Sequence, residues 1–142
     1  MARESIDRVR AGYDAFNRRD IGGILPLLSE DIVYRMPLDP IGMHPVFHGH
    51  EGVKRFYETL WDGFDEFRID VESVSELPGH VVVLSGTVTA RPEGGETTNF
   101  SISHFWKLAG GRAVAVAFHD AMNPLALLDE QASARKQGGS LQ

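Results

Sequence analysis

The sequence predicts an α+β fold in which helices cover one face of a curved, largely antiparallel sheet. Helical patterns fill the first half of the 142 residues, and four strand-like stretches joined by short turns fill the second half. Strands joined by such turns pair antiparallel, and helices segregated in this way pack together on one face of the sheet. We therefore expect a cone with one open end, formed by three N-terminal helices on a mixed sheet.

Three helices are expected before the last strands. In residues 3–19, apolar side chains recur at helical spacing on one face. Asp20 can cap a short apolar helix over 21–28. A third helix opens at Gly49, and its broad apolar stripe must pack on a sheet. The first helix contributes Ile6, Val9, Tyr13 and Phe16, and the third contributes Val53, Phe56, Tyr57, Leu60, Trp61 and Phe64.

Alternating apolar residues mark the strands. Residues 31–36 place Ile32, Tyr34 and Met36 on one face. Residues 37–48 contain three prolines and a glycine, which predict an ordered loop without regular structure. Later strands are expected at 67–74, 81–90, 98–108 and 112–120, and a short closing helix at 125–130 after Asn123 and Pro124.

Length and composition predict one soluble domain over 1–142. Its ordered core is expected at about 5–130, and the polar segment 133–142 is expected to be a disordered tail. No apolar run approaches the ~20 residues that span a bilayer, so no membrane contact is expected. The sequence has no cysteine and no apolar signal core, which favours the cytoplasm. The net charge of -6 argues against a nucleic-acid partner.

The last strand ends in a carboxylic acid. Val116, Phe118 and Asp120 share one face of it, and His119 lies on the other. If that face lines a cavity, burial raises the pKa of Asp120 and suits the group to proton transfer near neutral pH. The alternative is that Asp120 only caps the following turn.

Strand 98–108 has one mixed polar face and one almost wholly apolar face. Ser103 and Phe105 lie on the polar face, and His104 and Trp106 lie on the apolar one. Because only one face can meet the helices, we expect the other to contact a second copy of the chain. We place Ser103 and Phe105 in the pocket and the homodimer on the outer face of the sheet.

The histidines near the third helix invite a metal interpretation. His44, His48 and His50 are separated by four and two residues, but they lie in a proline-rich loop without a rigid element to orient them. We therefore expect no metal site, and His50 is either structural or a hydrogen-bond donor to the pocket.

Four segments in this order resemble the nuclear transport factor 2-like superfamily, which includes ketosteroid isomerase, SnoaL-like polyketide cyclases and limonene epoxide hydrolase. They are 13–20, 27–33, 47–53 and 103–106, and the resemblance extends over about residues 5–130. It implies a cone-shaped fold, a deep pocket and a dimer.

The resemblance does not imply steroid isomerisation. The isomerase's catalytic positions fall near Gly12, Met36 and Ser103, and Tyr13 is one residue away, which turns it by about 100° around its helix. The segment Asp120-Ala-Met-Asn-Pro124 is similar to the phenazine-biosynthesis condensing proteins of this superfamily, in which the acid before Asn-Pro exchanges protons. That likeness implies a general acid/base at Asp120.

These observations predict a cofactor-independent cyclase, isomerase or lyase acting on a hydrophobic ketone, enol or polyketide-like molecule. Asp120 would move the proton, assisted by Tyr34 or His50. A non-catalytic protein that binds or sequesters a small molecule is the alternative. The residues expected to contact the ligand are Phe16, Met36, Phe56, Tyr57, Leu60, Trp61, Ser103, Phe105, Val116 and Phe118.

Overall fold

The computed structural model of the chain describes residues 2–36 and 46–119. Asp120, the expected helix at 125–130, the expected tail at 133–142, and most of the expected loop lie outside the described residues. Within them, every helix is too short or too polar to cross a bilayer.

The helices form where the apolar spacing predicts them. Helix α1 spans Ala2–Asn17, α2 spans Ile21–Ile24, a 3-10 turn η1 follows at Leu25–Leu27, and α3 spans Gly49–Gly63. The Asp20 side chain accepts a hydrogen bond from the Gly23 amide at 3.2 Å, which confirms the expected cap of α2.

Six strands form one open, mixed sheet in the order β2-β1-β6-β5-β4-β3. Strands β3 to β6 pair antiparallel as consecutive neighbours, and β1 runs parallel to β6. This confirms the predicted α+β class. The strands are β1 Leu28–Arg35, β2 Val46–His48, β3 Phe64–Leu77, β4 Val81–Pro92, β5 Thr98–Ala109 and β6 Arg112–Phe118.

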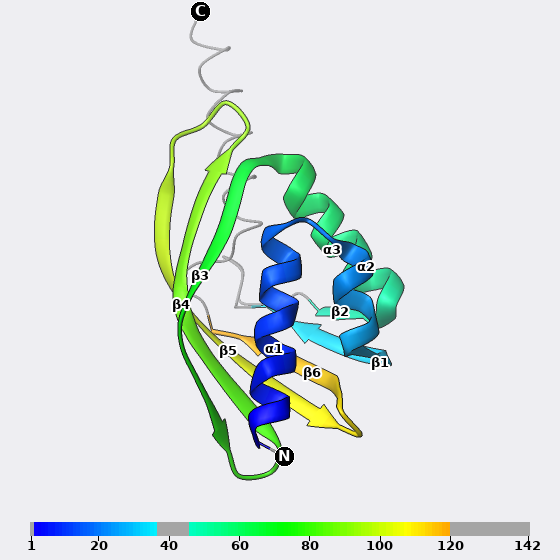
Figure 1. Cartoon of the computed structure of the whole chain (residues 1–142). Coiled ribbons are helices and arrows are strands. Elements are labelled where there is room, and N and C mark those ends of the chain that lie inside the picture. The colour runs from blue at the N-terminus through cyan, green and yellow to red at the C-terminus, as the bar shows by residue number, and fades with distance from the viewer. Residues whose placement is uncertain (1, 37–45, 120–142) are drawn as a thin grey trace, which may run out of the picture.

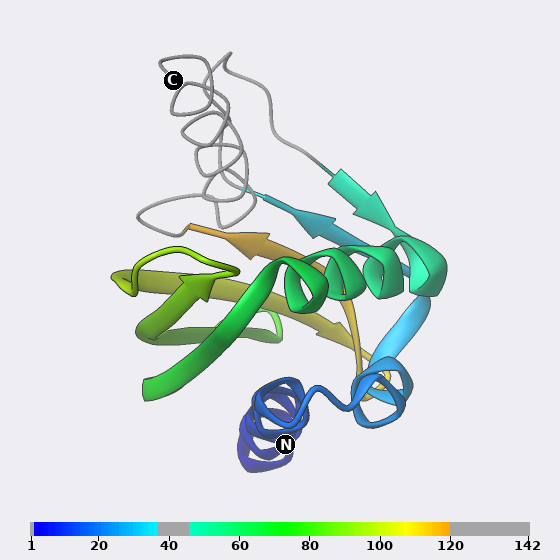
Figure 2. The ribbon, with the colours of Figure 1, turned by 90° about the horizontal axis from the view of Figure 1, so that it is seen from above.

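All helices lie on one side of the curved sheet (Figure 1). Helix α1 packs on β3 and β4, whereas α3 packs on β1 and β3. Seen from above in Figure 2, α1 and α3 both lie on the helix-covered face of the sheet. The single hydrophobic core lies in this layer.

The prediction that residues 37–48 lack regular structure is wrong for the last three of them. Residues Val46–His48 form β2, which pairs antiparallel with β1 and leaves its other side as a sheet edge. The β-branched Val46 and the aromatic Phe47 favour a strand, and a proline directly before an edge strand is tolerated. β2 brings the chain directly into α3.

Candidate functional site

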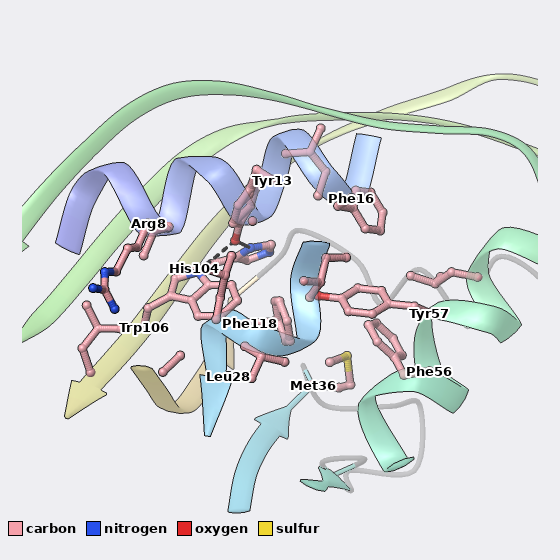
Figure 3. A pocket seen from close by; sticks show the side chains of 18 of the residues that line it. Arg8, Tyr13, Phe16, Leu28, Met36, Phe56, Tyr57, His104, Trp106 and Phe118 are labelled. Carbon is pink, nitrogen blue, oxygen red and sulfur yellow. Dashed lines mark hydrogen bonds between the residues drawn. The ribbon is translucent and has the colours of Figure 1, made fainter. Parts of the chain in front are cut away.

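A cavity lies between α1, α3 and the helix-covered face of the sheet (Figure 3). The centre of a water molecule can occupy about 60 Å³ of it, several times the ~10–15 Å³ that one buried water needs. Its wall is almost wholly apolar, with aromatic side chains from α1, α3, β3, β5 and β6. A cavity of this kind suits a small hydrophobic molecule held by a few polar groups.

Three hydrogen-bonded side chains form a polar cluster in the wall. Tyr13 comes from α1, and His104 and Trp106 come from the helix-covered face of β5 (Figure 3). The Trp106 Nε1–H donates to the Tyr13 hydroxyl oxygen at 2.9 Å, and the Tyr13 hydroxyl is hydrogen-bonded to His104 Nδ1. His104 is only 3% exposed. We call Tyr13, His104 and Trp106 the tyrosine–histidine cluster.

The hydrogen bonds of this cluster run in a defined order, from Trp106 to Tyr13 and from Tyr13 to His104. An indole N–H can only donate, so the Tyr13 oxygen is the acceptor of the bond from Trp106. That bond polarises the phenol and favours donation of its own proton to His104 Nδ1. The Phe118 ring meets the imidazole edge to face at 4.4 Å between centroids, which keeps the cluster in apolar surroundings. A phenol and an imidazole so arranged can give and accept a proton.

A second polar pair lies toward α3. The hydroxyls of Tyr34 on β1 and Tyr57 on α3 are 2.7 Å apart. Burial raises the pKa of Tyr34 well above its usual value, and the neighbouring Tyr57 raises it further. Burial also raises the pKa of Tyr57 well above its usual value, although the hydrogen bond from Tyr34 opposes this. Both phenols therefore stay protonated at neutral pH and can act only as hydrogen-bond partners.

The structure brings many of the expected ligand contacts together. Tyr57 lines the cavity, and Figure 3 shows its ring reaching in from α3 opposite the tyrosine–histidine cluster. The expected residues found in the wall are Phe16, Met36, Phe56, Tyr57, Leu60 and Phe118.

The expectation that Ser103 and Phe105 face the cavity is wrong. Alternation along β5 places both on the face away from the helices, where the Phe105 ring contacts His119 at 5.2 Å between centroids. The face that carries His104 and Trp106 is buried instead, because covering it removes more apolar surface from water. The helices thus cover the apolar face of β5.

Three other expected residues lie behind the cavity wall. Tyr34 is fully buried and reaches the cavity only through its bond to Tyr57. Val116 is buried opposite Trp106 in the β5–β6 register. Trp61 does not line the cavity, but its ring stacks on that of the lining residue Tyr57 at 5.4 Å between centroids. These three support the wall rather than form its surface.

His50 is not part of the cavity wall. Its Nε2 is 3.0 Å from the Leu28 carbonyl oxygen, and this hydrogen bond ties the start of α3 to the start of β1. His48 is exposed, and His44 and Asp120 lie outside the described residues. Across residues 2–36 and 46–119, no group of three or more potential ligands is placed to hold a metal ion.

Sequence reasoning did not assign the tyrosine–histidine cluster to the site. Tyr13 was set aside because its offset from the isomerase position would turn it away, yet both Gly12 and Tyr13 line the cavity. His104 was assigned to the outer face. The available signal was its position as the one titratable residue on the otherwise apolar face of 98–108.

Comparisons with known proteins agree with this architecture. A family model described as a SnoaL-like domain matches residues 9–116. A search of curated proteins finds no significant match.

Several solved structures share the fold over most of their length. An NTF2-like protein of unknown function from Burkholderia pseudomallei is 27% identical, with a TM-score of 0.75, and the match covers 89% of this chain and 95% of that one. TerC, co-crystallized with polyporic acid, is 25% identical with a TM-score of 0.73, covering 89% and 96%. A putative polyketide cyclase from Pseudomonas putida is 24% identical with a TM-score of 0.67, covering 81% and 90%, and shows the shared fold. Since the SnoaL-like model covers most of the sequence, the chain belongs to the SnoaL-like family of NTF2-like proteins.

Proposed function

We propose that the protein is a cofactor-independent acid/base enzyme of the cyclase, isomerase or lyase type. Its substrate would be a small hydrophobic ketone, enol or polyketide-like molecule bound between α1, α3 and the sheet. The observation that carries this proposal is the tyrosine–histidine cluster in the wall of an apolar cavity. TerC, a relative with the same fold, was crystallized with a small organic acid, which supports a small-molecule ligand.

The cluster and the opposite wall supply the two functions that such a reaction needs. The Tyr13 oxygen can take a proton from a carbon next to a carbonyl group as its own proton passes to His104 Nδ1, and the reverse transfer can return a proton to another position. The Trp106 N–H holds the phenol oxygen in place during the transfer. Tyr57, which stays protonated, can donate a hydrogen bond to the carbonyl oxygen from the opposite wall as negative charge develops there.

Asp120 remains the candidate acid/base from the sequence. It follows Phe118, whose ring lines the cavity, by two residues. Among the described lining residues there is no carboxylate, so a carboxylate-dependent reaction would need Asp120. Asp120 and His104 would then share the proton transfer.

Exchange of carbon-bound protons tests the proposal without knowledge of the natural substrate. Cyclic ketones and β-diketones of increasing size are incubated with the protein in D2O, and NMR follows deuterium entering next to the carbonyl. We expect catalysis by the wild type and losses of about 100-fold or more in His104→Gln and Asp120→Asn. His48→Gln changes an exposed histidine outside the cavity and should retain the wild-type rate. Undiminished exchange in both His104→Gln and Asp120→Asn would refute the assignment.

A non-catalytic binding protein is the second candidate. The polar atoms of Tyr13 and Trp106 are already paired inside the protein, as expected for a wall that only encloses an apolar molecule. Binding of the ketones by the wild type without any deuterium exchange would favour this function.

We also propose that the protein works as a cytoplasmic homodimer, joined through the face of the sheet that carries Phe105. That face has no helix over it in the described part of the chain. An apolar row of Val83 on β4, Phe105 on β5 and Ala117 on β6 crosses this face and supports a protein partner.

A further inference from the structure

Arg8 is the one permanently charged side chain among the described residues that line the cavity. It lies on α1, as Tyr13 does, and Figure 3 shows it at the opposite end of the cavity from Tyr57. Its side chain is exposed, so it marks the open end. The other described lining residues are apolar, apart from two tyrosines, one tryptophan and His104.

The β5–β6 turn holds the guanidinium in place. Arg8 Nη1 donates to the carbonyl oxygen of Gly111, which has a φ of 81° and also lines the cavity. A Cβ at this position would lie 2.6 Å from Nη1, so a larger residue would displace the arginine. Glycine at position 111 therefore permits the backbone conformation of the turn and leaves room for the Arg8 guanidinium.

No carboxylate of the described residues neutralises Arg8. Three other exposed arginines do have such partners, in the ion pairs Arg18–Asp20, Arg68–Asp70 and Arg91–Asp65. A guanidinium has five N–H donors, and the Gly111 carbonyl uses one nitrogen. With respect to the described residues, Arg8 thus presents unused donors and a positive charge, although the whole chain carries a net charge of -6.

We propose that the cavity takes an acidic amphipathic ligand, whose hydrophobic body fills the space beside α1 and whose anionic oxygen group binds Arg8. This inference rests on the proposed function and names the substrate class of the same cavity. Arg8 lies at the exposed end of the cavity, and the tyrosine–histidine cluster lies in its buried wall. A ligand with a carboxylate at one end and a carbonyl group further along its body would reach Arg8 and the tyrosine–histidine cluster together.

Matched pairs of acids and amides isolate the role of the charge. The probes are phenyl-substituted alkanoic acids of increasing chain length, each paired with its primary amide, and calorimetry measures the dissociation constants at low and high salt. For the best-fitting pair, we expect the wild type to bind the acid about 10-fold more tightly than the amide at low salt. This preference should shrink at high salt, because ions screen an exposed charge.

Three variants make the comparison specific. Arg8→Gln should bind acid and amide equally, and its affinity for the amide should stay within about twofold of wild type because the apolar wall is unchanged. Arg8→Lys keeps the charge but loses the forked geometry, and should retain part of the preference. Arg10→Gln removes an exposed arginine of α1 outside the cavity wall and should behave as wild type.

The possible outcomes separate this proposal from the proposed function. Equal binding of acids and amides by the wild type, or a preference that survives Arg8→Gln, would overturn the role of Arg8 and leave the apolar cavity and its proton chemistry standing. Binding of no probe at any chain length would overturn both. An acid preference in a protein that catalyses no deuterium exchange would identify a binding protein for hydrophobic acids.

Discussion

The buried pair of Tyr34 and Tyr57 links residue chemistry to stability. Burial raises the pKa of both phenols above the usual value of about 10. A raised pKa in the folded state means that the folded protein holds these protons more tightly than the unfolded chain. The resulting stabilisation is complete below about pH 10 and is lost as the pH rises from there toward the raised values.

We therefore expect the free energy of unfolding, measured by urea denaturation, to fall as the pH rises above about 10. Each tyrosine contributes a slope of up to about 1.4 kcal/mol per pH unit. The double variant Tyr34→Phe/Tyr57→Phe removes both hydroxyls, and its stability at pH 8 should lie within about 1 kcal/mol of wild type. If the free energy of unfolding had the same pH dependence in the wild type and the double variant, the raised pKa values of Tyr34 and Tyr57 would not be its cause.

Single residues were predictable where one helix or strand determines their direction. Phe56, Tyr57 and Leu60 lie in the cavity wall because the stripe of α3 faces the sheet, as its spacing predicts. The bond between Tyr13 and His104 joins residues 91 positions apart. No local pattern encodes that pairing, because it depends on which face of β5 the first helix covers.

At the scale of elements, the composition of the site depends on which face of β5 the helices cover. The alternation of polar and apolar residues along β5 is predicted correctly, but the expectation that Ser103 and Phe105 face the pocket selects the wrong one of the two faces. Burial of the apolar face is the larger energetic effect, at about 25 cal/mol for each Å² of apolar surface removed from water. The one polar titratable group on that face, His104, is therefore carried into the cavity.

The close pairing of β3 with β4 near Asp70 depends on Gly86. A Cβ at this position would lie 2.3 Å from the Asp70 backbone oxygen, beside the irregularity between Val71 and Ser73. Because backbone atoms rather than a flexible side chain block the space, Gly86→Ala must push the two strands apart. We expect it to lower the free energy of unfolding by about 1–3 kcal/mol in urea denaturation.

The neighbouring Ser85→Ala is a matched control for Gly86→Ala. Ser85 is half-buried on the opposite face of the same strand, and its loss should change stability by about 0.5 kcal/mol or less. Equal free energies of unfolding for the two variants would show that β3 and β4 move apart here without cost.

For the whole molecule, the sequence predicted the fold class and the packing of the apolar stripe of α3 on the sheet. Connection lengths and amphipathic spacing carry that information, and the short turns between β3 and β6 make the antiparallel order almost unavoidable. The parallel contact of β1 with β6 and the edge strand β2 were not specified, since both join segments distant in sequence. The cavity itself follows from the separation of α1 and α3 across the sheet.

The outer face of the sheet gives the prediction that belongs to the whole molecule. In the strand register, Val83, Phe105 and Ala117 form a row across β4, β5 and β6, and all three are half-buried without a helix above them in the described part of the chain. An apolar row of this kind favours contact with a second copy of the chain. Sedimentation velocity at micromolar concentration should therefore show a dimer.

Phe105→Glu should convert that dimer to a monomer, because two buried carboxylates would face each other across a two-fold interface without partners. Asp14→Lys is the control, because it also changes the charge of a side chain but does so at an exposed position of α1, away from this face. This variant should remain a dimer. The cavity lies on the opposite side of the sheet, so the monomeric variant should still bind the hydrophobic probes. A monomeric wild type would remove the interface, whereas a Phe105→Glu dimer would place it on another surface.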